Sequence, residues 1–414
     1  MNRENYRSEK YTSTTTTMKK YVVIKQAIFA TSIAVVGITG SAGVIPANAL
    51  TFNFTPAAGT SQLAIDGFTA AGAQWSALFK DNVTVNIDIN FAALGAGTLG
   101  EASSRIGLYP YDRVYAAATN ARTSADDNTA VNSLSKGSTF NLLLNRTANS
   151  PYGVGNATPY LDNNGNANNK TINLTAANAK ALGLANNGNN PDASIAFNNA
   201  FTWDFNRNDG ITAGAFDFVG IATHEIGHAL GFMSGVDVLD RTGAPNYEPE
   251  DRLDYVSMLD LFRYSNDSKN VRAIDWTADK REKYFSLDGG ITKIAAFSTG
   301  DIFGDGRQNG HWQDNLGLGI MDPTIAAGEL LQISENDKRA LDVIGWNRTV
   351  SNTIVSDLGT SNLNSMNITR ADAASVPEPS NLFGTLVLTA FGIKMVVKRQ
   401  QLRGAHAKAH GAQR

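Results

Sequence analysis

The 414-residue sequence contains no cysteine, little charge and few histidines. Without cysteine the chain can form no disulfide bond, no cysteine-bound metal site and no cysteine nucleophile. Any transition-metal site must therefore use histidine and carboxylate ligands. Charged residues make up 18% of the chain and the formal net charge is −3, so no basic surface for nucleic acid is expected.

Glycine is abundant, with 38 residues, and asparagine is frequent, which indicates a protein rich in turns and loops. Hydrophobic residues make up 42% of the chain, a fraction typical of a globular protein. A domain of about 300 residues buries enough surface to be stable without disulfide bonds. The composition therefore allows one large folded domain together with targeting segments.

Residues 1–49 are expected to be a signal peptide for export. A basic stretch at 18–20 precedes an apolar, small-residue run at 27–45, and Ala-Asn-Ala at 47–49 fits a cleavage site. Translation could start at the first methionine or at Met18. A retained membrane helix is the alternative interpretation of the apolar run.

The folded part is expected to begin near Leu50 with a strand, a helix and a second strand. Apolar residues from Ile65 to Phe79 recur at helical spacing after Thr60 or Ser61, and residues 83–91 alternate between apolar and polar. This order predicts a crossover unit in a largely parallel sheet. Further expected elements are a helical region at 113–134, a strand at 139–144, a short helix after Thr175 and a strand at 193–203.

The polar stretch from Asp204 to Asp209, with acidic and amide side chains, is similar to a Ca²⁺ loop. Gly210 stands one position late for that pattern, and no glutamate closes the loop. We therefore interpret the stretch as a turn, and it gives no support for Ca²⁺ binding.

The stretch from Asp217 to Gly231 contains the motif His-Glu-x-x-His. Asp217 is a suitable N-cap and Gly231 a suitable residue to end a helix, and the residues between them are mostly apolar. His224 and His228 are four residues apart, so both imidazoles lie on one face of the helix. This spacing predicts a Zn²⁺ site, with Glu225 close to the zinc-bound water.

A catalytic zinc usually takes three protein ligands and keeps one position for water. The sequence from His224 to Phe232 resembles the metzincin clan of zinc peptidases, in which a third histidine commonly follows the glycine by three residues. Here Ser234 occupies that position, which leaves Asp237 and His311 as candidates. The other two histidines lie in the polar tail, so His311 is favoured.

The downstream sequence extends this resemblance. Met321 lies ten residues after His311 and is similar to the methionine turn beneath the zinc of metzincins. A long insertion, residues 232–310, between the second and third zinc histidines resembles the leishmanolysin-like branch. The resemblance implies an α+β, metzincin-like zincin at 50–350, with a twisted mostly parallel sheet, a central zinc helix and a C-terminal helical subdomain. The insertion is expected to form a wall of the substrate cleft.

These predictions point to a zinc metalloendopeptidase that hydrolyses peptide bonds through a zinc-bound water activated by Glu225. The metal ligands would be His224, His228 and His311. An extended substrate is expected to pair with the strand at 194–203 as a sheet edge. The alternative is a non-catalytic protein of the cell surface or extracellular matrix with a structural zinc.

The end of the chain indicates sorting to the cell surface. A polar linker at 351–376 precedes Pro377-Glu-Pro, an apolar run and a basic tail. Residues 377–414 resemble a PEP-CTERM sorting signal, which exosortase enzymes of Gram-negative bacteria process; a plain transmembrane tail anchor is the alternative. The resemblance implies an exported protein, at the cell surface or extracellular, that is anchored transiently in the membrane. We expect a monomer that acts on a protein or peptide substrate.

Overall fold

The computed structural model describes residues 49–95, 97–242, 247–349 and 392–397. The expected signal peptide at 1–49 lies outside these residues except for its last position. The linker at 351–376 and most of the sorting segment at 377–414 also lie outside them. In the part of the chain that is described, no helix has the length and apolar character needed to cross a bilayer.

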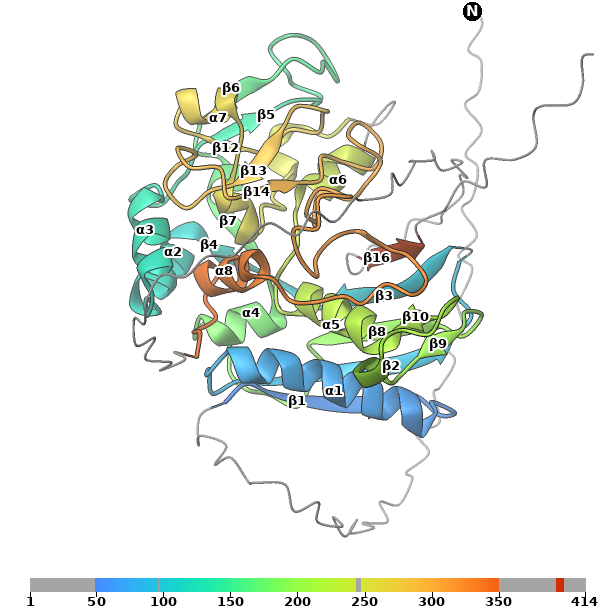
Figure 1. Cartoon of the computed structure of the whole chain (residues 1–414). Helices are drawn as coiled ribbons and strands as arrows, with labels where there is room; N and C mark the ends of the chain where they lie inside the picture. The colour runs from blue at the N-terminus through green and yellow to red at the C-terminus, as the bar shows by residue number, and fades with distance from the viewer. Residues whose placement is uncertain (1–48, 96, 243–246, 350–391, 398–414) are drawn as a thin grey trace, which may run out of the picture. The chain divides into compact units, whose positions relative to one another are not determined.

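The largest sheet has six strands in the order β1-β2-β8-β3-β16-β15 (Figure 1). β1, β2 and β8 run parallel, as expected, whereas β3 is antiparallel to both β8 and β16. β15 pairs in parallel with β16. The fold is thus α+β with a mixed sheet. Its strands are β1 (Thr51–Pro56), β2 (Thr84–Ala92), β3 (Thr98–Ser104), β8 (Ala193–Asn198), β15 (Thr324–Ile325) and β16 (Gly392–Val397).

The predicted crossover unit is confirmed: helix α1 (Gln62–Leu78) connects the parallel strands β1 and β2. Ser61 caps α1, because its side chain accepts a hydrogen bond from the Ala64 N–H. Along β2 the buried valine and isoleucine residues alternate with more exposed polar ones. One face of the sheet therefore packs against the core and the other faces solvent.

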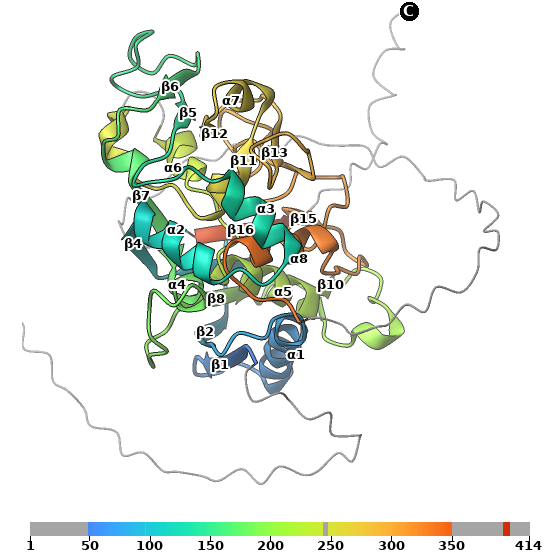
Figure 2. The ribbon, with the colours of Figure 1, turned by 90° about the vertical axis from the view of Figure 1, so that its left-hand side faces the viewer.

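Helix α1 packs closely against helix α5 (Phe218–Ala229), which carries two of the candidate metal ligands. A Cβ atom at Gly67 would come within 2.5 Å of the Phe218 ring, so only glycine fits at this contact. The Trp75 indole N–H donates a hydrogen bond to the Thr223 carbonyl, 2.9 Å away. In both views α5 lies directly above α1 (Figures 1 and 2).

Among the residues that the structure describes, short strands pair into four further small sheets. They join β9 with β10, β4 with β7, β12 with β5 and β6, and β11 with β13 and β14. The bounds are β4 (Ile106–Pro110), β5 (Leu142–Leu144), β6 (Tyr160–Asp162), β7 (Thr171–Thr175), β9 (Trp203–Asp204), β10 (Phe216–Asp217), β11 (Arg263–Tyr264), β12 (Ile274–Asp275), β13 (Lys283–Phe285) and β14 (Ala295–Phe297).

The remaining helices are short. They are α2 (Tyr111–Asn120), α3 (Ala125–Ser133), α4 (Ala176–Ala181), α6 (Val236–Arg241), α7 (Asn266–Asn270) and α8 (Glu335–Val343), with 3-10 turns η1 (Ala167–Asn169), η2 (Arg207–Asp209), η3 (Glu250–Arg252) and η4 (Leu259–Phe262). The helix expected after Thr175 is confirmed as α4, and the helical region at 113–134 is two helices.

The part of the chain after α5 differs from the expected helical subdomain. Its helices α6, α7 and α8 have six, five and nine residues, and the three-stranded sheet β11-β13-β14 lies among them. The stretch from Asp204 to Gly210 is a turn, as predicted, because Asp204 accepts hydrogen bonds from Thr212 and Asn206.

Candidate metal centre

Helix α5 begins and ends where the sequence predicts. Asp217 is the N-cap: its Oδ1 accepts a hydrogen bond from the Gly220 N–H, 2.8 Å away. An N-cap of this kind stabilises a helix by about 1 kcal/mol. Gly231 follows the helix with φ of +117°, in the left-handed region that glycine adopts without strain. All twelve residues of α5 are buried, so its two histidines face the interior.

His224, His228 and His311 converge, as the sequence predicts. The Nε2 atoms of His224 and His228 are 3.0 Å apart, and those of His228 and His311 are 3.2 Å apart. One ligand nitrogen from each side chain lies within 4.8 Å of the other two. All three side chains are buried. A buried group of three histidines from two distant segments could therefore hold a metal ion.

The other ring nitrogen of each histidine contacts a backbone carbonyl. A carbonyl can only accept a hydrogen bond, so each Nδ1 carries the proton and each Nε2 presents a lone pair. The acceptors are Ile320 O for His224 at 2.7 Å, Phe232 O for His228 at 2.6 Å and Gln308 O for His311 at 3.3 Å.

The protonation state of the three imidazoles suits a cation. Burial lowers the pKa of His224 to about 4. Burial and the neighbouring imidazoles lower the pKa values of His228 and His311 well below the usual range. Neutral imidazoles are the form that binds metal, and the His228 Nε2 lone pair, 3.0 and 3.2 Å from the other two Nε2 atoms, is repelled by theirs unless a cation lies between them. The donor set fits a transition-metal ion.

Asp237, the other candidate for the third ligand, supports His311 from behind. Its Oδ1 accepts hydrogen bonds from the Asn309 backbone N–H at 2.7 Å and the Asn309 side chain at 3.1 Å. Its Oδ2 accepts one from the Gly310 N–H at 3.3 Å. Burial raises the pKa of Asp237 to about 6. This carboxylate therefore fixes the loop before His311 and does not join the three imidazoles.

The insertion at 232–310 positions the third histidine, a role that the sequence does not reveal. The buried Arg263 guanidinium donates to the Asn309 carbonyl and side chain and to the Ser298 carbonyl. The Ser298 N–H donates to the His311 carbonyl at 3.0 Å. The insertion thus forms a scaffold around residues 309–311, and its expected role as a wall of a substrate cleft stays a prediction.

Ser234, at the position of the missing third histidine, points to a different partner. Its hydroxyl donates to Asp260 Oδ1 at 2.6 Å, and Asp260 Oδ2 accepts from the Gly235 N–H. A Cβ at position 235 would come within 1.7 Å of the Tyr255 carbonyl oxygen. The Ser234 hydroxyl is therefore engaged by Asp260 and does not join the three histidines.

Met321, the residue of the expected methionine turn, packs against helix α5. A Cβ on Gly227 would be 2.5 Å from the Met321 sulfur, so the thioether packs against the α5 backbone between His224 and His228. The preceding residue, Ile320, supplies the carbonyl that orients His224. Met321 therefore supports the face of α5 that carries the histidines, and glycine at 227 leaves the space that this requires.

A buried carboxylate that the sequence did not single out fixes this turn. Asp337, in helix α8, accepts hydrogen bonds from the backbone N–H groups of Ile320 and Met321 and from the Trp312 indole at 2.8 Å. Because Trp312 follows His311 in the sequence, the Asp337 carboxylate anchors both residues 320–321 and the segment that carries the third histidine. An aspartate three residues after the N-cap Ser334 gives only a capping signal in the sequence.

Glu225 lies on α5 next to His224 and is fully buried. A Cβ at Gly100 in β3 would be 3.2 Å from Glu225 Oε1, so the carboxylate lies against that strand. Helix α5 therefore carries both the two histidines and the carboxylate, and the carboxylate packs beneath β3. The expected edge strand at 194–203 is wrong in this respect, because β8 lies inside the sheet between β2 and β3.

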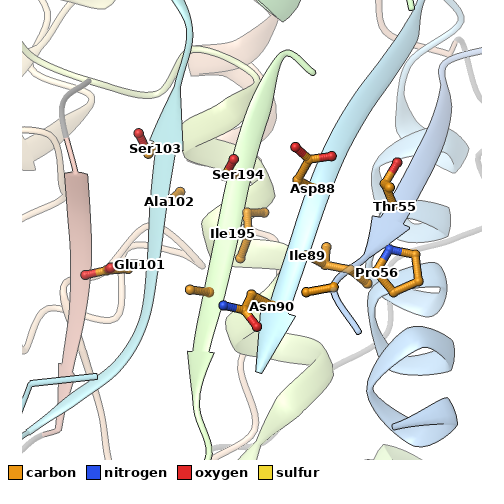
Figure 3. Close-up of a pocket in the computed structure, with 12 residues that line it drawn as sticks. Thr55, Pro56, Asp88, Ile89, Asn90, Glu101, Ala102, Ser103, Ser194 and Ile195 are labelled. Atoms are coloured by element: carbon orange, nitrogen blue, oxygen red, sulfur yellow. The ribbon is translucent and has the colours of Figure 1, made fainter. Parts of the chain in front are cut away.

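The opposite face of the sheet carries a separate groove of about 630 Å³ (Figure 3). Glu101, Ser103, Ser194 and Asp88 project into it from β3, β8 and β2. Successive side chains alternate across a strand, so Glu101 faces away from the side on which Gly100 meets Glu225. This groove contains none of the candidate metal ligands.

A comparison of the chain with family models, curated proteins and solved structures finds no match.

Proposed function

We propose that the chain is an exported zinc-dependent endopeptidase. The observation that carries this proposal is the convergence of three neutral, correctly oriented imidazoles beside a buried glutamate. Three histidine ligands with a further position for water are typical of catalytic zinc, whereas structural zinc normally has four protein ligands. Asp237, the nearest alternative ligand, is engaged by Asn309 and Gly310. The resemblance to leishmanolysin-like metzincins adds to this support.

Each residue would have a distinct role in hydrolysis. His224, His228 and His311 would hold the metal, which when bound supplies Lewis-acid polarisation of the scissile carbonyl and a more acidic water. Glu225 would accept a proton from the attacking water and pass it to the leaving amine. Burial of the site excludes bulk water and strengthens the electrostatic interactions within it.

The substrate would pair with β3, in place of the strand expected from the sequence. β3 runs directly above Glu225 and uses its outer edge for backbone pairing with β16. In that pairing Met395 lies opposite Gly100 in an antiparallel register. An extended peptide in the same position would pair with the strand that packs on the Glu225 carboxylate, which is the geometry of strand addition.

The pairing of β16 predicts that the C-terminal segment competes with substrate. The variant Lys394→Pro/Met395→Pro removes two consecutive backbone N–H groups, one of which faces β3 because they alternate. We expect kcat/KM for a peptide substrate to rise several-fold in the full-length protein, since the competent fraction increases. The control Lys394→Ala/Met395→Ala keeps both N–H groups. Equal kcat/KM values for the two variants would contradict competition at this edge.

The direct test of the proposed activity is hydrolysis of casein or gelatin by the zinc-loaded protein. We expect activity that 1,10-phenanthroline abolishes and that added Zn²⁺ restores, because the metal supplies the chemistry. Protein that binds one zinc per chain but cleaves neither substrate nor a peptide library would favour the non-catalytic alternative. In that case zinc would have a structural role in a surface or matrix protein.

A further inference from the structure

We propose that a second metal site, selective for Ca²⁺, lies in the asparagine-rich loop between β6 and β7. Asp162, Asn164, Asn166 and Asn168 occupy alternate positions of this loop. Glu250, from η3, meets the same group of side chains across 88 residues of sequence (250 − 162). We call these five side chains the loop cluster. It lies apart from the histidine centre in the fold and shares no residue with it.

The two carboxylates of the loop cluster are buried and have no cationic partner. Asp162 and Glu250 are 2% and 8% exposed. No ion pair involves either one among the residues that the structure describes. Burial raises the pKa of Asp162, and the charge of Glu250 raises it further. Two neighbouring anions held out of water in this way are stabilised by a cation between them.

Amide N–H groups of the loop donate to these carboxylates, and two of the amide oxygens have no partner. Asn168 is completely buried, and its Nδ2 donates to Asp162 Oδ2 at 2.7 Å. Its Oδ1 has no hydrogen-bond partner, and neither has Asn166 Oδ1. A buried amide oxygen without a partner costs about 1–3 kcal/mol unless a ligand satisfies it. A bound cation would satisfy both oxygens.

The chemistry of the loop cluster selects the ion. Its candidate ligand atoms are oxygens, from two carboxylates and from three asparagines once their amides turn the oxygen inward, and it has no imidazole or thiolate. Hard oxygen ligands on a flexible loop suit Ca²⁺, whose known loops also place ligands at alternate positions. Two formal negative charges are few for a Ca²⁺ site. We therefore expect a dissociation constant of about 10⁻⁴ to 10⁻³ M, the range of extracellular Ca²⁺ modules.

The test uses the full-length, zinc-loaded protein and Ca²⁺ itself. We expect 10 mM CaCl₂ to raise Tm by about 3 °C or more, since the ion binds only the folded state. MgCl₂ at the same concentration should have a smaller effect, because Mg²⁺ prefers to keep its waters. An unchanged Tm in CaCl₂, or an equal rise in MgCl₂, would overturn the proposal.

A second measurement places the ion. Tb³⁺, a probe for Ca²⁺ sites, should give luminescence on excitation of tyrosine, because the Tyr160 hydroxyl donates to Glu250 at 2.9 Å. Ca²⁺ should displace it. The variant Asp162→Asn/Glu250→Gln should lose this signal and the Tm rise, while keeping its zinc content. Asp204→Asn, in the exposed loop that resembles a Ca²⁺ loop, is the matched control and should behave like wild type. Loss of the signal in the control alone would move the site there and overturn the assignment.

Discussion

Substitution of Glu225 by glutamine is expected to abolish peptide hydrolysis while leaving the metal bound. Glutamine has almost the same shape as glutamate but cannot accept a proton, so the step that activates water is lost. A positioned general base contributes about 10²- to 10⁴-fold to the rate, and we expect a loss in kcat within that range. The measurement is kcat on a peptide substrate together with zinc content by mass spectrometry.

The matched control is Glu282→Gln, the same chemical change in an exposed glutamate that pairs with Lys293 on the surface. It should keep wild-type kcat and zinc content. Full zinc content and more than a tenth of wild-type kcat in Glu225→Gln would remove Glu225 from the mechanism. Loss of zinc in this variant would make Glu225 a metal ligand, contrary to the role proposed for it.

Helix α5 and the two candidate metal ligands that it carries could be predicted from the sequence because the signals are local. Asp217 and Gly231 mark the helix ends within fifteen residues, and a separation of four residues fixes the relative orientation of His224 and His228. The third ligand was predicted by elimination, since the remaining histidines lie in the polar tail. That reasoning identifies His311 but says nothing of how the chain brings it to α5.

The supports of His311 could not be predicted, because each depends on a contact across a long stretch of sequence. Asp237 holds Asn309, 72 residues away, and Asp337 holds Trp312, 25 residues away. In the sequence these aspartates look like any polar residue in a loop or helix cap. Only the fold shows that their oxygens accept the backbone and indole N–H groups around the metal centre.

Strand β3 could not be predicted from the sequence for a different reason. Its sequence, Thr98–Ser104, consists mostly of small residues, so it lacks the apolar alternation that marks β2. Small residues are needed there because Gly100 lies against Glu225 and Phe197. Because the sequence does not reveal β3, it predicts that the apolar strand at 194–203 is the edge of the sheet, whereas β8 lies inside it. The small residues that make β3 hard to recognise in the sequence also allow it to pack closely against Glu225.

Removal of the third imidazole is expected to have the other large effect. In His311→Ala the metal would keep only the two ligands on α5, while the cavity admits water in place of the ring. Loss of a hydrogen bond that merely orients a ligand costs about 10- to 100-fold in metal affinity, so loss of the ligand itself should cost more than 100-fold. Peptide hydrolysis should disappear with the metal.

The variant Asp237→Asn tests whether Asp237 binds the metal or only supports the loop before His311. Asparagine keeps an acceptor oxygen for the Asn309 N–H, so the loop should retain most of its structure. We expect zinc affinity within about 10-fold of wild type in this variant. Because Asp237 and His311 belong to the same small region, a general defect in folding would affect both variants alike.

Zinc content after dialysis, measured on wild type, His311→Ala and Asp237→Asn, tests the central claim most directly. The geometry of the three imidazoles predicts one zinc per chain in wild type and Asp237→Asn, and almost none in His311→Ala. A full zinc complement in His311→Ala, with loss of zinc from Asp237→Asn, would contradict the three-histidine centre and assign the third position to the carboxylate.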